Sequence, residues 1–169
     1  TMMAHPIALQ LRNLQSLVEI GVDKNTVVVF PAPLMSTIAE LGTFLARNYG
    51  VTVTSVTLSP EQCAVAKQRA IDEGVTDRVD FREQDYRELE GTYDRVVSIA
   101  MMEAIGIVEF DTYFRKIKAL TRPGGFALVH CIGRMSPPGT TAPFIRKYIY
   151  PGGYVPALSE VFASLERTG

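Results

Sequence analysis

Apolar positions along the chain change repeatedly between a period of two and a period of three to four residues. Five short runs are rich in β-branched or aromatic residues, which is typical of buried strands. These runs are TVVVF (26–30), VTVTSVTL (51–58), VDFRE (79–83), DRVVSIA (94–100) and FALVHCIG (126–133). We predict a strand at each run, with an RPGG turn at 122–125 leading into the last one.

Between these runs the spacing of apolar residues is helical. It predicts helices over 7–18, 37–48, 59–74 and 107–120. The third helix has the clearest boundary signals, namely an N-cap, a proline in the first turn, a capping-box partner and a terminal glycine. These signals are Ser59, Pro60, Gln62 and Gly74. The fourth helix is expected to bury its regularly spaced apolar residues, Phe110, Phe114, Ile117 and Leu120.

Strands and helices alternate with short loops, which indicates a parallel sheet covered by helices on both faces. The predicted fold class is therefore α/β, a three-layer sandwich with a mostly parallel sheet. A ligand is expected beyond the carboxyl ends of its strands. The regular pattern fades after Gly133, where we expect a loop, a short helix with a turn, and a final helix over 161–169.

Composition narrows the classes of function. The chain has 169 residues, enough for one domain with a sizeable core. Its formal net charge of −1 argues against a nucleic-acid partner bound through phosphate neutralisation. No apolar run is long enough to span a bilayer, and the first residues lack the apolar core of a signal peptide. We therefore expect a cytoplasmic protein.

Cysteine and histidine are scarce. Cys63 and Cys131 are too few for a disulfide framework or a metal cluster, so both are expected to be reduced thiols. His5 and His130 are the only histidines, which excludes most histidine-rich metal sites. No bound metal is predicted.

Polar groups follow the second and third predicted strands. Thr57, Leu58 and Gln62 lie where a hydroxyl or an amide can bond a ribose or an amino-acid moiety, although plain helix capping explains the same residues. Asp85 follows the third strand and is placed to accept a hydrogen bond from an adenine amino group. As an unpaired acid of a surface loop it would have no such role.

The fourth and fifth strands also end in ionisable residues. Glu103 follows two methionines, so its carboxylate is either desolvated for a task or turned towards solvent. His130 lies in an apolar strand, where a satisfied core histidine is the simpler interpretation. All these clusters fall at the same edge of the predicted sheet, and we expect them to form a single pocket.

Several motifs resemble the cyclopropane-fatty-acyl-phospholipid synthases. VTLSPEQ, DYREL, HCIG and YIYPGGYVP occur in that family's order and spacing, between about Tyr49 and Glu160. The resemblance implies a Rossmann-like class I methyltransferase fold and an S-adenosylmethionine-dependent transferase of lipid biosynthesis. Its reaction is methyl transfer to the double bond of an unsaturated phospholipid acyl chain, and bicarbonate then accepts a proton as the ring closes.

The resemblance also assigns residues. Thr57, Leu58 and Gln62 match contacts to the ribose and methionine part of the cofactor. Asp85 and Tyr86 match the loop beside the adenine. The catalytic residues that match a bicarbonate site are Glu103, His130 and, through its backbone, Ile132.

The first part of the chain resembles another family. Residues 5–47 are similar to the C-terminal segment of stomatin-like (band-7) proteins, so the domains implied are 1–48 and 49–169. The VVVFPAPLMSTIAELG segment stands where the synthases have a glycine-rich cofactor loop. Pro31 and Pro33 fix φ there and remove two backbone donors. We expect the stomatin-like segment to stand in for the first strand and helix of the sheet.

The synthase family continues beyond the position that matches Gly169. The resemblance therefore implies a methyltransferase fold that is incomplete at its C-terminus, with an unpaired sheet edge that favours a homo-oligomer. It also implies peripheral contact with a membrane surface, where Arg134, Arg146 and Lys147 would meet lipid phosphates. The alternatives are a non-catalytic oligomerisation module built on the stomatin-like segment, or a truncated or fused gene product.

Overall fold

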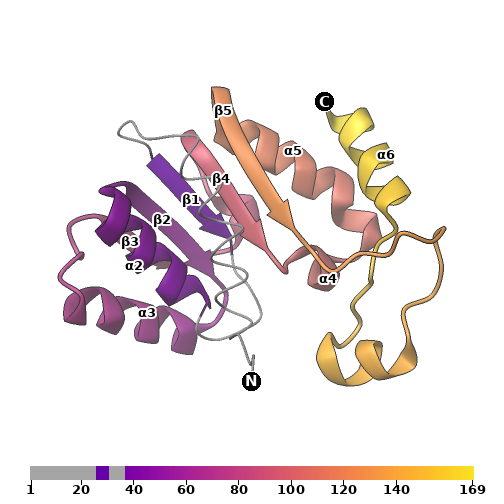
Figure 1. Cartoon of the computed structure of the whole chain (residues 1–169), viewed down its shortest axis with the longest axis horizontal. Helices are drawn as coiled ribbons and strands as arrows, with labels where there is room; N and C mark the ends of the chain where they lie inside the picture. The colour runs from indigo at the N-terminus through magenta and orange to yellow at the C-terminus, as the bar shows by residue number, and fades with distance from the viewer. Residues whose placement is uncertain (1–25, 31–36) are drawn as a thin grey trace, which may run out of the picture.

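The computed structural model describes residues 26–30 and 37–169. The expected helix over 7–18 and the proline-bearing stretch 31–36 lie outside the described residues. Five described strands form one sheet in the order β3-β2-β1-β4-β5, and every neighbouring pair is parallel (Figure 1). They are β1 (Thr26–Phe30), β2 (Thr52–Thr57), β3 (Val79–Glu83), β4 (Tyr93–Ile99) and β5 (Thr121–His130).

β1 occupies the centre of the sheet. Val28 pairs with Thr54 of β2 on one side and with Val96 of β4 on the other. Because the strand order reverses between β1 and β4, a ligand is expected at this point, beyond the carboxyl ends of the strands. The stomatin-like origin of this first unit, and the oligomerisation module built on it, stay predictions.

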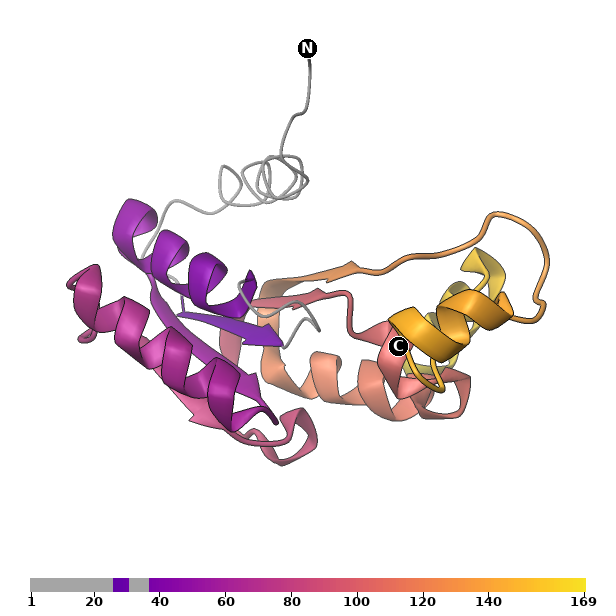
Figure 2. The same ribbon diagram turned by 90° about the horizontal axis from the view of Figure 1, so that it is seen from below.

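Helices cover both faces of the sheet and make the three predicted layers (Figure 2). α2 (Thr37–Tyr49) and α3 (Pro60–Asp72) lie on one face. α5 (Phe110–Leu120) lies on the other, and α6 (Leu158–Thr168) packs against α5. No helix in the described ranges has the length and apolar character needed to cross a bilayer.

The core divides into two clusters, one on each face of the sheet. Val97 and Ile99 of β4 pack with residues of α2 and α3, whereas Val96 packs on the α5 side. This alternation follows from the two-residue period of a strand, and β4 is largely buried because helices cover both faces of the sheet. The α5 cluster contains the four residues that the helical spacing predicted as buried.

The structure of the RPGG segment differs from the predicted turn that leads into the last strand. Residues 122–125 bulge out within β5, because the register passes from Tyr93 opposite Thr121 to Arg95 opposite Phe126. Gly124 has a φ of 78°, and the Arg122 guanidinium forms an ion pair with the Asp94 carboxylate. β5 therefore begins before the glycines, and it ends at His130 rather than at Gly133 as predicted.

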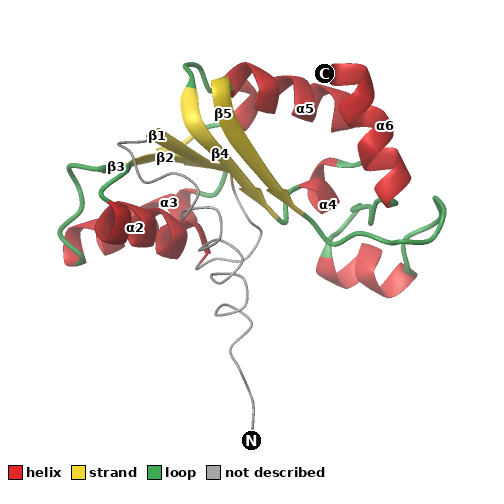
Figure 3. Cartoon of the chain, turned by 45° about the horizontal axis from the view of Figure 1, so that its top comes forward, coloured by secondary structure: helices red, strands yellow, loops and turns green. Residues whose placement is uncertain are grey.

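The predicted helix over 107–120 is divided. α4 (Met102–Ile105) is followed by Gly106, whose φ of 76° breaks the helix, then by a short 3-10 helix, η2 (Ile107–Glu109), and by α5. Beyond β5 the chain forms a projecting segment that contains η3 (Ile145–Ile149) and leads back to α6 (Figures 1 and 3). The final helix begins at Leu158, three residues before the predicted start at 161.

Candidate cofactor and catalytic site

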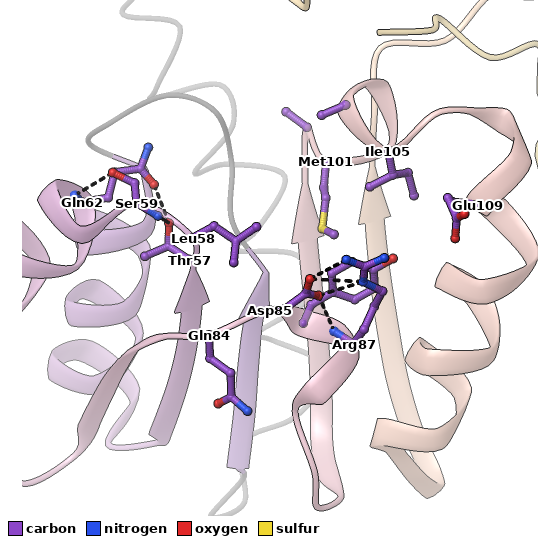
Figure 4. A pocket seen from close by; sticks show the side chains of 13 residues that line it. Thr57, Leu58, Ser59, Gln62, Gln84, Asp85, Arg87, Met101, Ile105 and Glu109 are labelled. Carbon is purple, nitrogen blue, oxygen red and sulfur yellow. Dashed lines mark hydrogen bonds and ion pairs between the residues drawn. The ribbon is translucent and has the colours of Figure 1, made fainter. Parts of the chain in front are cut away.

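A cavity of about 450 Å³ lies at the carboxyl ends of β2, β3 and β4 (Figure 4). All five residues predicted to bind the cofactor line it: Thr57, Leu58, Gln62, Asp85 and Tyr86. The carboxyl ends of parallel strands meet at one edge of a sheet, which is why residues from separate motifs converge here.

The β2 end of the cavity is built around the start of α3. The Ser59 hydroxyl accepts the Gln62 N–H at 3.2 Å, so Ser59 is the N-cap as predicted. The Gln62 side chain does not complete a capping box, because its Oε1 accepts the Thr57 hydroxyl at 2.8 Å. Thr57 Oγ1 in turn accepts the Ser59 N–H at 3.2 Å. These bonds hold the Thr57 and Gln62 side chains at the cavity wall, where Leu58 is largely exposed.

Asp85 and Arg87 form an ion pair on the β3 side, with 2.6 Å between Asp85 Oδ2 and Arg87 Nη2. The Arg87 backbone N–H also donates to Asp85 Oδ1 at 2.8 Å, so Asp85 caps the 3-10 turn η1 (Tyr86–Glu88). The side-chain hydrogen bond from Arg87 holds the pKa of Asp85 below its usual value, against the effect of partial burial. Asp85 is therefore an ionised acceptor, and the alternative interpretation of Asp85 as an unpaired acid of a surface loop is wrong.

Tyr86 forms the apolar floor of the same loop. Its side chain is buried, and its ring packs edge-on against Tyr113 with 6.0 Å between centroids. Desolvation raises the pKa of Tyr86, so its phenol is neutral at physiological pH. Tyr86 is placed to offer contact surface rather than charge.

The β4 end of the cavity contains a strained residue. Ala100 has a φ of 53°, in the left-handed region that residues other than glycine rarely adopt. The Ala100 N–H donates to the His130 backbone oxygen at 2.8 Å, a bond that ties β4 to β5 at this point. Met101 and Ile105, which follow the turn, make an apolar wall of the cavity.

Glu103 is fully buried beside this wall and is therefore desolvated, one of the two predicted possibilities. Its Oε1 accepts the backbone N–H of Ile132, and its backbone oxygen accepts the Tyr154 N–H at 2.9 Å. Its Oε2 has no hydrogen-bond partner among the residues that the structure describes. A Cβ at Gly153 would lie 2.6 Å from the Glu103 backbone oxygen, so only glycine fits at this position.

Glu103, His130 and Ile132 are not among the residues that line the 450 Å³ cavity. That all the predicted site residues form a single pocket stays a prediction. His130 borders a second cavity of about 560 Å³ between β5, α5 and α6. Its register partner on β4 is Ile99, which belongs to the core cluster of α2 and α3. His130 Nδ1 is buried without a hydrogen-bond partner in ranges 26–30 and 37–169. The interpretation of His130 as a satisfied core histidine stays a prediction.

Several lining residues were not singled out from the sequence: Gln84, Arg87, Met101, Ile105 and Glu109. Arg87 carried a signal, because a basic residue two positions after an acid in a short turn can pair with it. Ile105 belongs to α4, a helix that was not predicted, and Glu109 was hidden within the helix predicted over 107–120. The described residues contain no group of three or more His, Cys, Asp or Glu side chains that could hold a metal ion.

Comparison with known proteins places this geometry in a family. Residues 39–169 match the family model described as mycolic acid cyclopropane synthetase. The matched range includes residues 39–48, which the sequence motifs assigned to the stomatin-like segment. Over 126 residues the chain is 38% identical to the cyclopropane-fatty-acyl-phospholipid synthase of Escherichia coli strain K12, covering 75% of this chain and 32% of that protein.

Solved structures show the same fold. The cyclopropane synthase MmaA2 from Mycobacterium tuberculosis superposes with a TM-score of 0.79 at 23% identity, covering 95% of this chain and 60% of that one. The mycolic acid cyclopropane synthase CmaA1, complexed with SAH and CTAB, gives 0.75 at 18% identity, covering 94% and 61%. The chain spans about a third of the length of the curated relatives it matches. On the match to residues 39–169, the chain belongs to the mycolic acid cyclopropane synthetase family.

Proposed function

We propose that this chain forms the cofactor-binding part of an S-adenosylmethionine-dependent enzyme. The reaction we propose is methyl transfer to the double bond of an unsaturated phospholipid acyl chain, as in a cyclopropane-fatty-acyl-phospholipid synthase. The observation that carries the proposal is the convergence of Thr57, Leu58, Gln62, Asp85 and Tyr86 on one cavity at the carboxyl edge of the sheet. Family membership and the 38% identity to the Escherichia coli synthase support the class of reaction.

The residues of the cavity fit the cofactor. Its volume of about 450 Å³ lies within the usual range for small-molecule sites. Thr57 and Gln62 offer a hydroxyl and an amide for the ribose and methionine part, and Asp85 offers an ionised acceptor for the adenine amino group. Tyr86 and Met101 provide apolar surface. The CmaA1 structure, a complex with SAH, supports this ligand class. When bound, the cofactor would supply an electrophilic methyl group.

We also propose that Glu103 and His130 hold bicarbonate. Two buried atoms, Glu103 Oε2 and His130 Nδ1, have no hydrogen-bond partner among the described residues, which fits a small polar guest. The Ile132 N–H, expected as a third contact, already donates to Glu103 Oε1. Its role in this proposal is to position the carboxylate. Bicarbonate would supply a base for the proton released when the ring closes.

Cofactor binding is the first test, measured by isothermal titration calorimetry with S-adenosylmethionine. Thr57→Val removes a hydroxyl and Asp85→Asn removes a charge, and each is expected to weaken binding roughly tenfold, the value of one good hydrogen bond. Asp80→Asn is the matched control, because Asp80 pairs with Arg82 on the exposed part of β3. The absence of heat at millimolar cofactor would remove the proposal.

The acceptor is tested separately with vesicles of unsaturated phosphatidylglycerol and methyl-labelled cofactor. Label recovered in the acyl chains supports lipid methylation, and the rate is expected to fall when bicarbonate is removed from the buffer. Cofactor binding without any labelled lipid would leave a methyltransferase domain but overturn the acyl-chain substrate. An unchanged rate in bicarbonate-free buffer would overturn the role proposed for bicarbonate.

A further inference from the structure

The Asp85 and Arg87 side chains form a fixed unit at the β3 end of the 450 Å³ cavity. Arg87 Nη2 lies 2.6 Å from Asp85 Oδ2, and Arg87 Nε lies 3.1 Å from both carboxylate oxygens. The Arg87 backbone N–H also donates to Asp85 Oδ1 at 2.8 Å. Two N–H groups of a planar guanidinium on one carboxylate fix the plane of the pair as well as its position. The pair therefore presents its remaining polar atoms in set directions.

Backbone hydrogen bonds tie this pair to the sheet. The Gln84 N–H donates to the Thr57 backbone oxygen at 3.0 Å, and the Glu88 N–H donates to the Asp85 backbone oxygen at 3.0 Å. Thr57 ends β2, so the loop that carries the pair is joined to the cavity wall with the predicted ribose contacts. Leu89, directly after η1, is fully buried and anchors the other end of the turn. The place of the pair in the cavity is thus set before a ligand binds.

Both members of the pair keep polar capacity. A carboxylate has about four acceptor positions, and three N–H groups of Arg87 use the carboxylate of Asp85. On Arg87 the second terminal nitrogen, Nη1, has no hydrogen-bond partner among the described residues, and the side chain is 57% exposed. Both residues line the cavity (Figure 4). One free acceptor position and one free donor are therefore neighbours at the cavity.

A second pair of the same kind shows what distinguishes this one. Arg82 pairs with Asp80, again two residues earlier, with 2.6 Å between Nη2 and Oδ2. That pair is on the exposed part of β3, and neither of its residues lines the 450 Å³ cavity. Exposed ion pairs contribute little to stability, so pairing alone indicates no function. Asp85 and Arg87 differ because they are held at a ligand cavity.

We propose that the Asp85–Arg87 pair recognises the Watson–Crick edge of adenine, with Arg87 Nη1 donating to the ring nitrogen N1 while Asp85 accepts from the 6-amino group. The inference rests on the proposed function, since it identifies how that site selects its base. Adenine has a donor, the 6-amino group, beside an acceptor, N1, and the pair offers an acceptor beside a donor. Hypoxanthine and guanine have an oxygen at C6 and a proton on N1, so both of their groups would oppose the pair.

Arg87 is the member of the pair that determines specificity. Asp85 alone would accept one hydrogen bond from any exocyclic amino group, whereas the added donor of Arg87 requires an unprotonated ring nitrogen beside it. The second bond also fixes the orientation of the purine in its plane. Leu58 and Tyr86 line the same cavity and offer apolar surface to the faces of the ring.

The test is isothermal titration calorimetry of the 169-residue chain with S-adenosylhomocysteine, its 1-deaza analogue and S-inosylhomocysteine. The 1-deaza analogue has C–H in place of N1 and keeps the 6-amino group. We expect it to bind about tenfold more weakly than S-adenosylhomocysteine, the value of one good hydrogen bond. S-Inosylhomocysteine loses both bonds, and we expect it to bind about a hundredfold more weakly.

Three variants assign these ratios to residues. Arg87→Met removes the donor, so it is expected to bind S-adenosylhomocysteine and the 1-deaza analogue equally. Asp85→Asn can turn an amide N–H towards the oxygen of hypoxanthine, so the preference for S-adenosylhomocysteine over S-inosylhomocysteine should narrow to about tenfold. Arg82→Met is the matched control and should keep both ratios of the unmodified chain. Because each ratio compares two ligands on one protein, a general loss of stability does not produce these changes.

The outcomes separate this inference from the proposed function. Equal binding of S-adenosylhomocysteine and its 1-deaza analogue by the unmodified chain would overturn the role of Arg87 and leave the proposed function intact. An Arg87→Met protein that keeps the tenfold ratio would assign Arg87 to holding the η1 turn, and would overturn the inference as well. No binding of any of the three ligands by the unmodified chain would overturn the proposed function and this inference with it.

Discussion

The buried carboxylate of Glu103 accepts the backbone N–H of Ile132, a residue 29 positions later in the sequence. This bond joins the turn after β4 to the chain leaving β5, at the place where the projecting segment begins. The carboxylate of a residue expected to be catalytic thus also has a structural role. The two roles are separable, because one oxygen is used by Ile132 and the other has no partner in the described part of the chain.

Glu103→Ala is expected to lower the free energy of unfolding by about 3 kcal/mol, because it leaves the Ile132 N–H unpaired and opens a cavity. Glu103→Gln keeps an oxygen for that N–H and is expected to cost about 1 kcal/mol. Denaturant unfolding measures both, with Glu88→Ala on the exposed η1 turn as the control. Equal costs for the alanine and glutamine variants would mean that the hydrogen bond to Ile132 does not hold the segment.

Gly153 is expected to be intolerant of any side chain. A Cβ at this position would lie 2.6 Å from both the Glu103 backbone oxygen and the Tyr150 Cβ, so Gly153→Ala must displace the base of the projecting segment. We expect a loss of about 2 kcal/mol in unfolding free energy, the usual cost of overpacking. Gly133→Ala is the control, since its Cβ would lie 3.4 Å from the Pro156 oxygen. A Gly153→Ala protein as stable as Gly133→Ala would contradict the packing described here.

Ala100 is expected to respond to substitution unlike an ordinary alanine. Its left-handed backbone costs about 1 kcal/mol, which glycine avoids, so Ala100→Gly should leave stability within about 0.5 kcal/mol of the unmodified chain. Ala64→Gly, in the exposed part of α3, should cost about 1 kcal/mol. Ala100→Val adds a β-branched side chain in the strained region, and we expect it to be the least stable of the three. Thermal unfolding would refute this account if Ala100→Gly were as destabilising as Ala64→Gly.

The layers of the fold could be predicted from the sequence because local patterns determine them. The β-branched run at 26–30 gave β1 with its observed bounds, and Ser59 was recognised as a cap because its signal lies within four residues. The bulge at 122–125 was not predictable in the same way. It depends on the register of β5 against β4 and on the pairing of Arg122 with Asp94, which are tertiary contacts.

The candidate site was predictable to the same extent. That Thr57 and Asp85 would share a cavity follows from the parallel sheet, in which both follow a carboxyl strand end. The sequence could not predict that His130 lies outside this cavity. The position of a residue along a strand indicates which edge of the sheet it is near, but not which neighbouring helices enclose it. The Arg87 partner of Asp85 and the Ile132 partner of Glu103 required the folded geometry.

The attachment of α6 to α5 is expected to weaken in acid. Hydrogen bonds from Arg167 and from Ser164 lower the pKa of Asp111 from 3.8 to about 2, with the Arg167 Nη2 2.7 Å from Asp111 Oδ1. Because the folded pKa lies below the unfolded value, this stabilisation is complete above about pH 4 and is lost as the pH falls towards 2. The protection factors of the α6 amides, which correct for the slower intrinsic exchange in acid, should therefore fall over that interval.

Two variants control this measurement. In Asp111→Asn the α6 amides should have low protection factors at neutral pH as well. In Asp77→Asn, a change at an exposed site, their protection should depend on pH as in the unmodified chain. An α6 whose protection is independent of pH between 4 and 2, or unchanged in Asp111→Asn, would show that other contacts hold this helix.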